Sequence, residues 1–228
     1  MKRSIFIFSL LSASLCMAFS PARAISQDSI NAIAASINAE INSGACLEFL
    51  DESGPNLEYH NIIRNLYIKD RGYSFYYYVI PNYIVEYSIG YNPKKGVIEY
   101  RYTPNKYDLT QGSDRIILTD EAPVSRKVAK SLSRLISAAT EPAQLKHFED
   151  FYHLNDSIGW GFIRENGDIY EFHDKDGNAA QCWSPSVGNS KELVQIMETV
   201  CQLVEDGKSK EISSLKPDID RLTKKFGK

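Results

Sequence analysis

The sequence has few of the features that mark catalytic or nucleic-acid-binding proteins. It contains four histidines, and His60, His147 and His153 lack the H-x-x-x-H spacing of a helical metal site. A glycine-rich phosphate loop and a G-x-S-x-G nucleophile elbow are both absent. Lysine and arginine number 26 against 29 acidic residues, which gives a net charge of −3. Because nucleic-acid binding needs a basic surface, we expect no nucleic-acid partner, and the missing motifs predict no cofactor.

Long apolar runs are also missing after residue 24. A membrane span needs about 20 apolar residues, and only the N-terminus approaches this length. There Lys2 and Arg3 precede an apolar stretch over 5–19, which ends before the small-residue triplet 22–24. This order is typical of a secretory signal peptide over residues 1–24 that is removed by cleavage. We therefore expect a soluble mature chain, residues 25–228, that is periplasmic or secreted and has no membrane span.

The charge of this mature chain is unevenly distributed. Residues 1–24 carry three basic side chains and no acidic ones, so their removal changes the net charge from −3 to −6. Residues 208–228 hold seven basic and three acidic side chains, which leaves about −10 on residues 25–207. The sequence thus predicts an acidic body, residues 25–207, followed by a basic C-terminal tail or short helix over 208–228.

Cysteine is scarce, which limits the disulfides that can form. Four are present, and Cys16 lies in the predicted signal peptide. In an oxidising compartment two of the remaining three should pair. Cys182 and Cys201 flank a short loop that contains proline and glycine, so we predict a Cys182–Cys201 disulfide with Cys46 left as a thiol. Other pairings among these three cysteines stay open.

Hydrophobic periodicity predicts helices and an antiparallel sheet in the first half of the mature chain. Isoleucines recur at helical spacing over residues 26–44, which indicates an N-terminal amphipathic helix. Residues 45–118 indicate a meander of antiparallel strands, because apolar and polar residues alternate over 83–91 and again over 97–102. A continuous aromatic run over 73–80 is typical of a strand that is covered on both faces.

The second half predicts further helices and one hairpin. A helix is expected over 123–139 with Pro123 in its first turn, and a shorter helix after Thr140. A hairpin should join strands 160–164 and 169–173 through the turn residues Asn166-Gly167.

A last helix is expected from Asn189, with Glu192 completing a capping box, to a point before Gly207. The order of elements predicts the α+β class: an antiparallel β-meander packed by an N-terminal helix and two to three further helices, with a C-terminal β-hairpin and helix. One continuous sheet and two lobes divided near residue 120 are both compatible with it.

The segment Asp174-Lys175-Asp176-Gly177-Asn178 resembles the opening of an EF-hand calcium loop, with Asp174, Asp176 and Asn178 as ligands. The resemblance ends there, because Ala179 replaces the required glycine and Pro185 replaces the bidentate glutamate. A turn between strands is therefore the favoured interpretation, and a calcium site is the alternative.

Gln181-Cys182-Trp183 resembles the segment around the nucleophile of papain-like enzymes. All four histidines precede Cys182, however, which reverses the order in that family. The predicted hairpin would place His173 beside Glu171 and near Cys182, so an envelope hydrolase with Cys182, His173 and Glu171 is one alternative. A disulfide or a buried thiol explains Cys182 more simply.

Tyrosine is unusually frequent: ten of fourteen lie between residues 73 and 107. A sheet face that presents these side chains would suit recognition of a partner, whereas core packing would account for them equally well. The predicted binding residues are Tyr83, Tyr87, Tyr91, Tyr100 and Tyr102.

Together these features predict a non-catalytic exported binding protein that recognises a protein or another envelope macromolecule. An inhibitor or an immunity-type protein is one class of this kind. The alternatives are the Cys–His hydrolase and a carrier for a small ligand held between the helices and the sheet.

Overall fold

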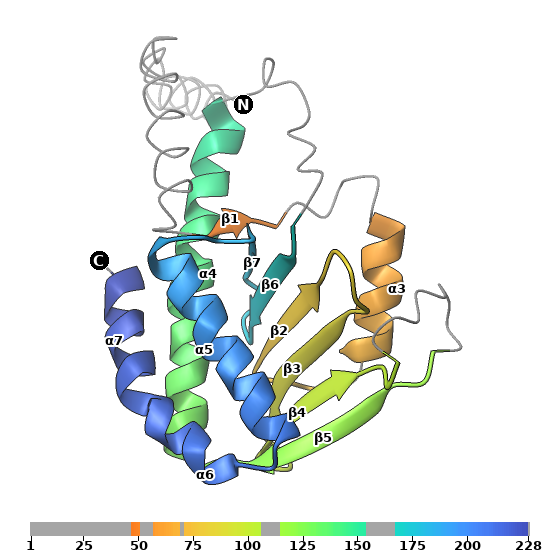
Figure 1. Cartoon of the computed structure of the whole chain (residues 1–228). Coiled ribbons are helices and arrows are strands. Elements are labelled where there is room, and N and C mark those ends of the chain that lie inside the picture. The colour runs from red at the N-terminus through yellow and green to blue at the C-terminus, as the bar shows by residue number, and fades with distance from the viewer. Residues whose placement is uncertain (1–46, 51–56, 69–70, 106–114, 154–166, 228) are drawn as a thin grey trace, which may run out of the picture. The chain divides into compact units, whose positions relative to one another are not determined.

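The computed structural model describes residues 47–50, 57–68, 71–105, 115–153 and 167–227 (Figure 1). These residues form a seven-stranded antiparallel sheet with several helices, which confirms the α+β class. The strand order is β1-β7-β6-β2-β3-β4-β5. The strands are β1 (Glu48–Phe49), β2 (Phe75–Ile80), β3 (Tyr87–Asn92), β4 (Val97–Tyr102), β5 (Leu118–Pro123), β6 (Ile169–Asp174) and β7 (Ala179–Trp183).

The predicted meander is present as strands β2 to β5, each paired with the next. The β3–β4 turn is stabilised by Asn92, whose side-chain oxygen accepts the backbone N–H groups of Lys94 and Lys95. Gly96 completes this turn at φ 71°, a conformation that favours glycine. Pro123 ends β5 opposite Val97 and does not begin the following helix, which corrects its predicted position.

The hairpin predicted through Asn166-Gly167 is wrong. Strand β6 pairs with β7 along one edge and with β2 along the other, so neither edge is left for residues 160–164. The turn of the observed hairpin is 175–178, the segment that resembled a calcium loop. Strands from both sides of residue 120 thus belong to one sheet.

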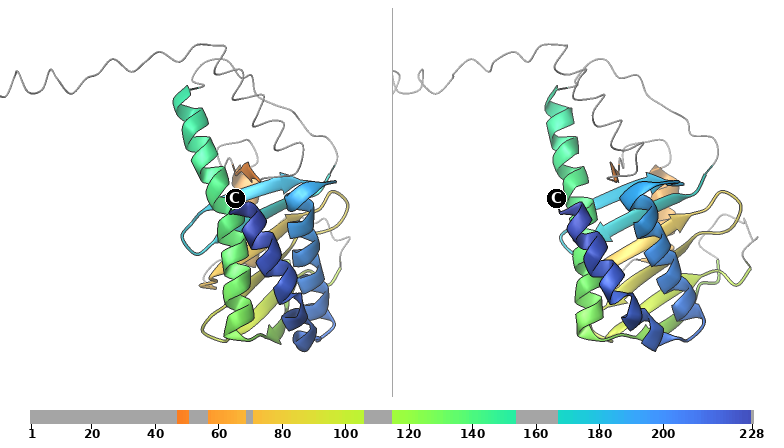
Figure 2. Two further views of the ribbon diagram at one scale, coloured as in Figure 1. Left: turned by 90° about the vertical axis from the view of Figure 1, so that its left-hand side faces the viewer. Right: turned by 60° about the vertical axis from the view of Figure 1, so that its left-hand side comes forward.

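Helices cover both faces of this sheet, unequally. On the first face α4 packs against β1, β6 and β7, α5 packs against β4 and β5, and α7 packs against both helices (Figures 1 and 2). On the second face α3 contributes Tyr67 to a small cluster with Tyr78. The helices are α3 (Leu57–Tyr67), α4 (Arg126–His153), α5 (Gly188–Glu205), α6 (Ser209–Ile212) and α7 (Lys216–Phe226), with a 3₁₀ turn, η1 (Ser213–Leu215).

Helix α4 merges the two helices that were predicted on either side of Thr140. It starts after Ser125, whose hydroxyl accepts the backbone N–H of Val128 at 3.4 Å in the manner of an N-cap. It then continues past Pro142 to His153. The buried residues of its first half, among them Leu132 and Leu135, complete the main core.

Helix α5 has the buried stripe that its periodicity predicts, from Leu193 to Val204. Its N-cap, however, is Val187 without a side-chain hydrogen bond, so Asn189 lies inside the helix and not at the predicted N-cap position. The Glu192 carboxylate instead binds Arg221 at 2.8 Å, a contact that ties α5 to α7.

The C-terminal segment is a packed part of the fold. Within it the side chains of Ile212, Ile219, Leu222 and Phe226 are buried in the main core. Arg221, Lys224 and Lys225 of α7 are exposed, so the predicted basic helix is amphipathic.

Several predictions fall outside the described residues: the signal peptide, the helix over 26–44, Cys46 and the strand over 160–164. Within the described part of the chain, no helix is long and apolar enough to cross a membrane.

Candidate functional site

The five tyrosines predicted to bind a partner do not share one exposed face. Tyr83 lies in the β2–β3 loop and is 77% exposed, whereas Tyr91 and Tyr100 are buried. Tyr87 and Tyr102 are half-buried and pack against the main core under α5. The side chains of the other four tyrosines lie on the same face of the sheet, as the alternation predicted. That face is covered by α5 and does not face solvent.

A single carboxylate on α5 binds two of the tyrosines beneath it. Glu198 accepts a hydrogen bond from the Tyr77 hydroxyl at 2.5 Å and another from the Tyr87 hydroxyl at 2.9 Å. Burial and the nearby charge of Glu198 raise the pKa of both tyrosines, so both keep their protons and act as donors. These hydrogen bonds hold α5 on the sheet and give the hydroxyl of the fully buried Tyr77 a hydrogen-bond acceptor.

Cys182 and His173 are not brought together. Cys182 pairs with Tyr170 in the β6–β7 register, and its side chain belongs to the main core between sheet and helices. His173 and Glu171 alternate with Tyr170 along β6, so their side chains lie on the second face. The sheet therefore separates the proposed nucleophile from the proposed base.

His173 and Glu171 do share a face, as predicted, and there they join a buried polar cluster. Arg64 of α3 donates to the Glu171 carboxylate at 3.3 Å, and His173 Nε2 lies 3.4 Å from the same oxygen. The Tyr76 ring stacks on His173 with a centroid distance of 4.2 Å. These contacts connect α3 to β6 and β2.

The disulfide predicted between Cys182 and Cys201 is absent, since both are buried thiols. Cys201 lies near Tyr77, Tyr87 and Tyr100 of β2 to β4, whereas Cys182 is on β7, beyond β6 from those strands. Closing such a bond requires Cα atoms within about 7 Å. Burial and the Glu198 charge raise the pKa of Cys201, so this thiol is protonated and unreactive.

Asp174 stabilises the β6–β7 turn. Its carboxylate accepts the backbone N–H of Asp176 at 2.8 Å and both the backbone and the amide N–H of Asn178. The Asp176 carboxylate points to Lys175 instead. Among the described residues, no group of three or more His, Cys, Asp or Glu side chains is placed to hold a metal ion.

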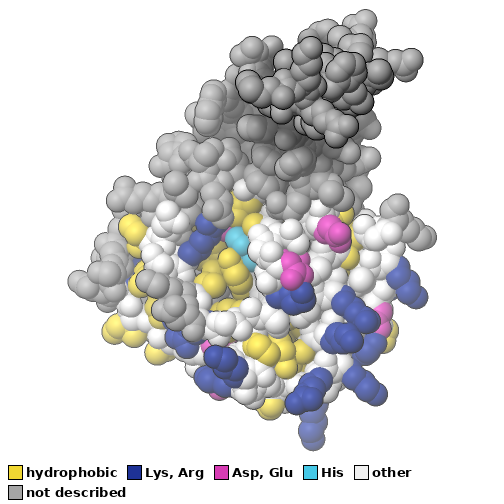
Figure 3. Space-filling view, turned by 180° about the vertical axis from the view of Figure 1, so that it is seen from behind, with side chains coloured by type: hydrophobic (Ala, Val, Ile, Leu, Met, Phe, Trp, Pro, Cys, Tyr) yellow, Lys and Arg dark blue, Asp and Glu magenta, His cyan; other side chains and the backbone are white. Residues whose placement is uncertain are grey.

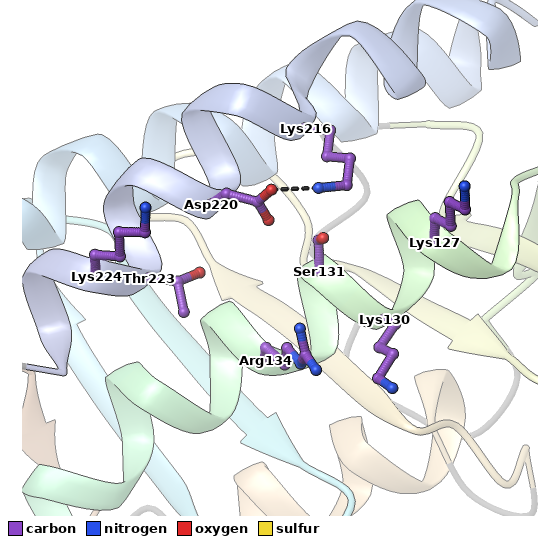
Figure 4. A pocket seen from close by; sticks show the side chains of 8 residues that line it. All are labelled: Lys127, Lys130, Ser131, Arg134, Lys216, Asp220, Thr223 and Lys224. Carbon is purple, nitrogen blue, oxygen red and sulfur yellow. Dashed lines mark hydrogen bonds and ion pairs between the residues drawn. The ribbon is translucent and has the colours of Figure 1, made fainter.

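A hollow lined mostly by basic side chains lies between α4 and α7 (Figure 4). We call it the α4–α7 groove; its volume is about 450 Å³. Figure 2 shows the two helices side by side along its length. Its lining residues are Lys127, Lys130, Ser131 and Arg134 of α4 and Lys216, Asp220, Thr223 and Lys224 of α7.

Five cations face one carboxylate in this groove. Asp220 binds Lys216, and hydrogen bonds from Lys216 and Ser131 hold its pKa below the usual range. Within the described part of the chain, the other four basic side chains form no ion pair, and Lys127, Lys130 and Lys224 are exposed. The groove therefore presents uncompensated positive charge on a protein that is acidic overall.

Helix geometry arranges these cations in two rows. Lys127, Lys130 and Arg134 are spaced i, i+3 and i+7 and lie on one face of α4 over about 10 Å. Lys216 and Lys224 extend over about 12 Å of α7. Seen from behind, the described surface shows many Lys and Arg side chains toward one margin, and further ones lie elsewhere on the same face (Figure 3).

Sequence reasoning found the positive charge of 208–228 but not the groove. The spacing of the three α4 cations was visible in the sequence, but nothing there places α7 beside them. The chain matches no protein-family model, no curated protein and no solved structure.

Proposed function

We propose that this chain is an exported, non-catalytic binding protein of the cell envelope that holds an acidic segment of a partner protein in the α4–α7 groove. The observation that carries this proposal is the convergence of five cations on one groove with a single carboxylate among them. An inhibitor or immunity-type protein would act in this way, by covering part of its partner.

The arrangement of the cations in the groove favours an acidic polypeptide as the ligand. Two rows of cations about 10 Å long match several carboxylates along one segment better than a single small anion. Four of the five cations are lysines, which attract carboxylates as point charges without a fixed geometry. Nucleic acid needs a wider basic surface than this groove, and the rest of the chain is acidic.

The separation of Cys182 from His173 supports a binding role over the hydrolase alternative. A thiol nucleophile needs a base within hydrogen-bond reach, and the sheet lies between Cys182 and His173.

The test measures binding of poly-L-glutamate by isothermal titration calorimetry with three forms of the chain. The groove variant carries Lys127→Glu, Lys130→Glu and Arg134→Glu. The matched control carries Lys94→Glu, Lys191→Glu and Lys210→Glu, exposed residues outside the groove that form no ion pair. Both variants change the net charge equally. A difference in their affinity for poly-L-glutamate therefore reflects where the substituted residues lie and not the total charge.

We expect the control to bind like the wild type and the groove variant to bind at least tenfold more weakly. Each exposed ion pair contributes about 0.2–1 kcal/mol, and reversal adds repulsion. Binding should also weaken as salt rises. Equal weakening in both variants would contradict the proposal, as would tighter binding of a single-stranded oligonucleotide of the same charge.

Export has a separate test. Protein recovered from the periplasmic or secreted fraction should begin at Ile25, as determined by intact mass. A full-length chain in that fraction would contradict cleavage after Ala24.

A further inference from the structure

A second hollow lies between α5 and strands β3 and β4. Its volume is about 200 Å³. The side facing the sheet includes Tyr87, Tyr100 and Tyr102, and α5 contributes Glu198, Cys201, Gln202 and Glu205. These four are spaced i, i+3, i+4 and i+7, so they occupy one face of the helix. We call this hollow the tyrosine pocket.

Aromatic rings in two orientations form the sheet side of the pocket. The Tyr87 and Tyr100 rings meet edge to face at 72°, with centroids 5.9 Å apart. The Tyr100 and Tyr102 rings stack at 4.9 Å. The face of a tyrosine ring carries negative electrostatic potential and attracts a cation within about 6 Å.

Carboxylates add to this negative potential without a cation to balance them. Among the residues that the structure describes, no Lys, Arg or His side chain pairs with Glu198 or Glu205. Glu86, which also borders the pocket, is neutralised by Arg115. Burial raises the pKa of Tyr100 most, and the neighbouring Cys201, Glu205 and Glu198 raise it further.

We propose that the tyrosine pocket binds a small quaternary ammonium ion. The pocket is separate from the α4–α7 groove, and its ligand does not depend on the groove. Both oxygens of Glu198 already accept tyrosine hydroxyls, which leaves fewer acceptors for the three N–H groups of a primary amine. A quaternary ammonium group donates no hydrogen bond and gains instead from ring faces and an unpaired negative charge. A hard metal ion would need more free oxygen ligands.

The test uses choline chloride and its neutral carbon isostere, 3,3-dimethylbutan-1-ol, in calorimetric titrations of the full chain. We expect choline to bind and the isostere to bind at least tenfold more weakly, because the two differ mainly in charge. Equal affinity for both, or no binding of choline at millimolar concentration, would overturn the proposal. Tighter binding of putrescine than of choline would also overturn it, because that would indicate a primary-amine site.

Variants locate the site without disturbing the core. Tyr102 is half-buried and Glu205 is exposed, so both can be changed with the fold retained. Tyr102→Leu should weaken choline at least fivefold, whereas Tyr102→Phe keeps the ring and should bind like the wild type. Glu205→Gln should also weaken it, and the matched control Glu211→Gln, an exposed carboxylate on α6, should not. Unchanged affinity in both Tyr102→Leu and Glu205→Gln would exclude the pocket as the site.

Two controls check the identity of the site and of the ligand. The α4–α7 groove variant should bind choline like the wild type. Failure of the groove proposal can therefore be distinguished from failure of the tyrosine-pocket proposal. The protein should not co-sediment with phosphatidylcholine vesicles, because the negative charges of Glu198 and Glu205 repel the phosphate of the lipid headgroup. Sedimentation with vesicles and no binding of free choline would overturn the assignment to a free ligand.

Discussion

Replacement of Leu222 by alanine tests whether α7 is an integral part of the fold. Leu222 is 0% exposed and lies in the main core, as does Ile219 one turn earlier. Alanine removes three buried carbons, which at about 0.8 kcal/mol each accounts for about 2.4 kcal/mol. The cavity left between the helices adds to this loss, and measured Leu→Ala changes in cores fall in the range of about 2–5 kcal/mol. We expect a destabilisation of about 2.5–4 kcal/mol.

Urea unfolding followed by circular dichroism measures this change. With a slope of about 2 kcal/mol per molar urea, the midpoint should fall by about 1–2 M while the slope stays constant. Lys224→Ala on the exposed side of the same helix should change the unfolding free energy by less than about 0.5 kcal/mol. If Leu222→Ala and Lys224→Ala unfolded alike, α7 would be a peripheral tail, and the α4–α7 groove would lose one of its walls as a fixed structure.

Three further predictions concern the sheet. Gly90→Ala should lower the urea midpoint through a loss of about 1–3 kcal/mol, because the added Cβ would lie 2.5 Å from the Tyr73 ring; an unchanged midpoint would show that this ring moves freely. Burial alone would raise the pKa of Glu99, but hydrogen bonds from Tyr73, Asn92 and Lys95 hold it below 4.5, so the stability it provides above pH 4.5 should be lost as pH falls. In urea titrations across pH 3–6, the unfolding free energy of Glu99→Gln should depend less on pH than that of the wild type. An equally steep pH dependence in the variant would contradict this role of Glu99. Asp174→Ala should raise amide hydrogen exchange across the β6–β7 turn, while calcium should leave the wild-type melting temperature unchanged.

The strands and helices that depend on local periodicity could be predicted from the sequence. Alternation predicted β3 and β4, and the apolar stripe predicted α5; α5 buries one face, whereas both strands are buried almost throughout. The hairpin failed because Asn166-Gly167 is a strong local turn signal, whereas the pairing of β6 depends on β2, which is distant in the sequence. The N-cap of α4 was missed because Pro123 suits a first turn as well as the end of an edge strand.

The candidate sites depended on packing that the sequence does not encode locally. Alternation places Tyr87 and Tyr100 on one face but does not say whether solvent or α5 covers that face. Likewise the spacing of Lys127, Lys130 and Arg134 defines a basic face of α4, but only the docking of α7 converts that face into a groove. Both sites lie where helices far apart in the sequence meet the sheet or each other.

The position of β6 between β7 and β2 has a consequence for the order in which the chain folds. Strands β2 to β5 leave the ribosome before β6, and until β6 emerges the edge of β2 that pairs with it has no partner strand. That strand, Phe75–Ile80, is an uncharged run of aromatic and β-branched residues, which is the composition that promotes intermolecular strand addition. The nascent meander is therefore the aggregation-prone stage of folding, and it ends only when β6 pairs with β2. A chain truncated before residue 169 would be left permanently at that stage.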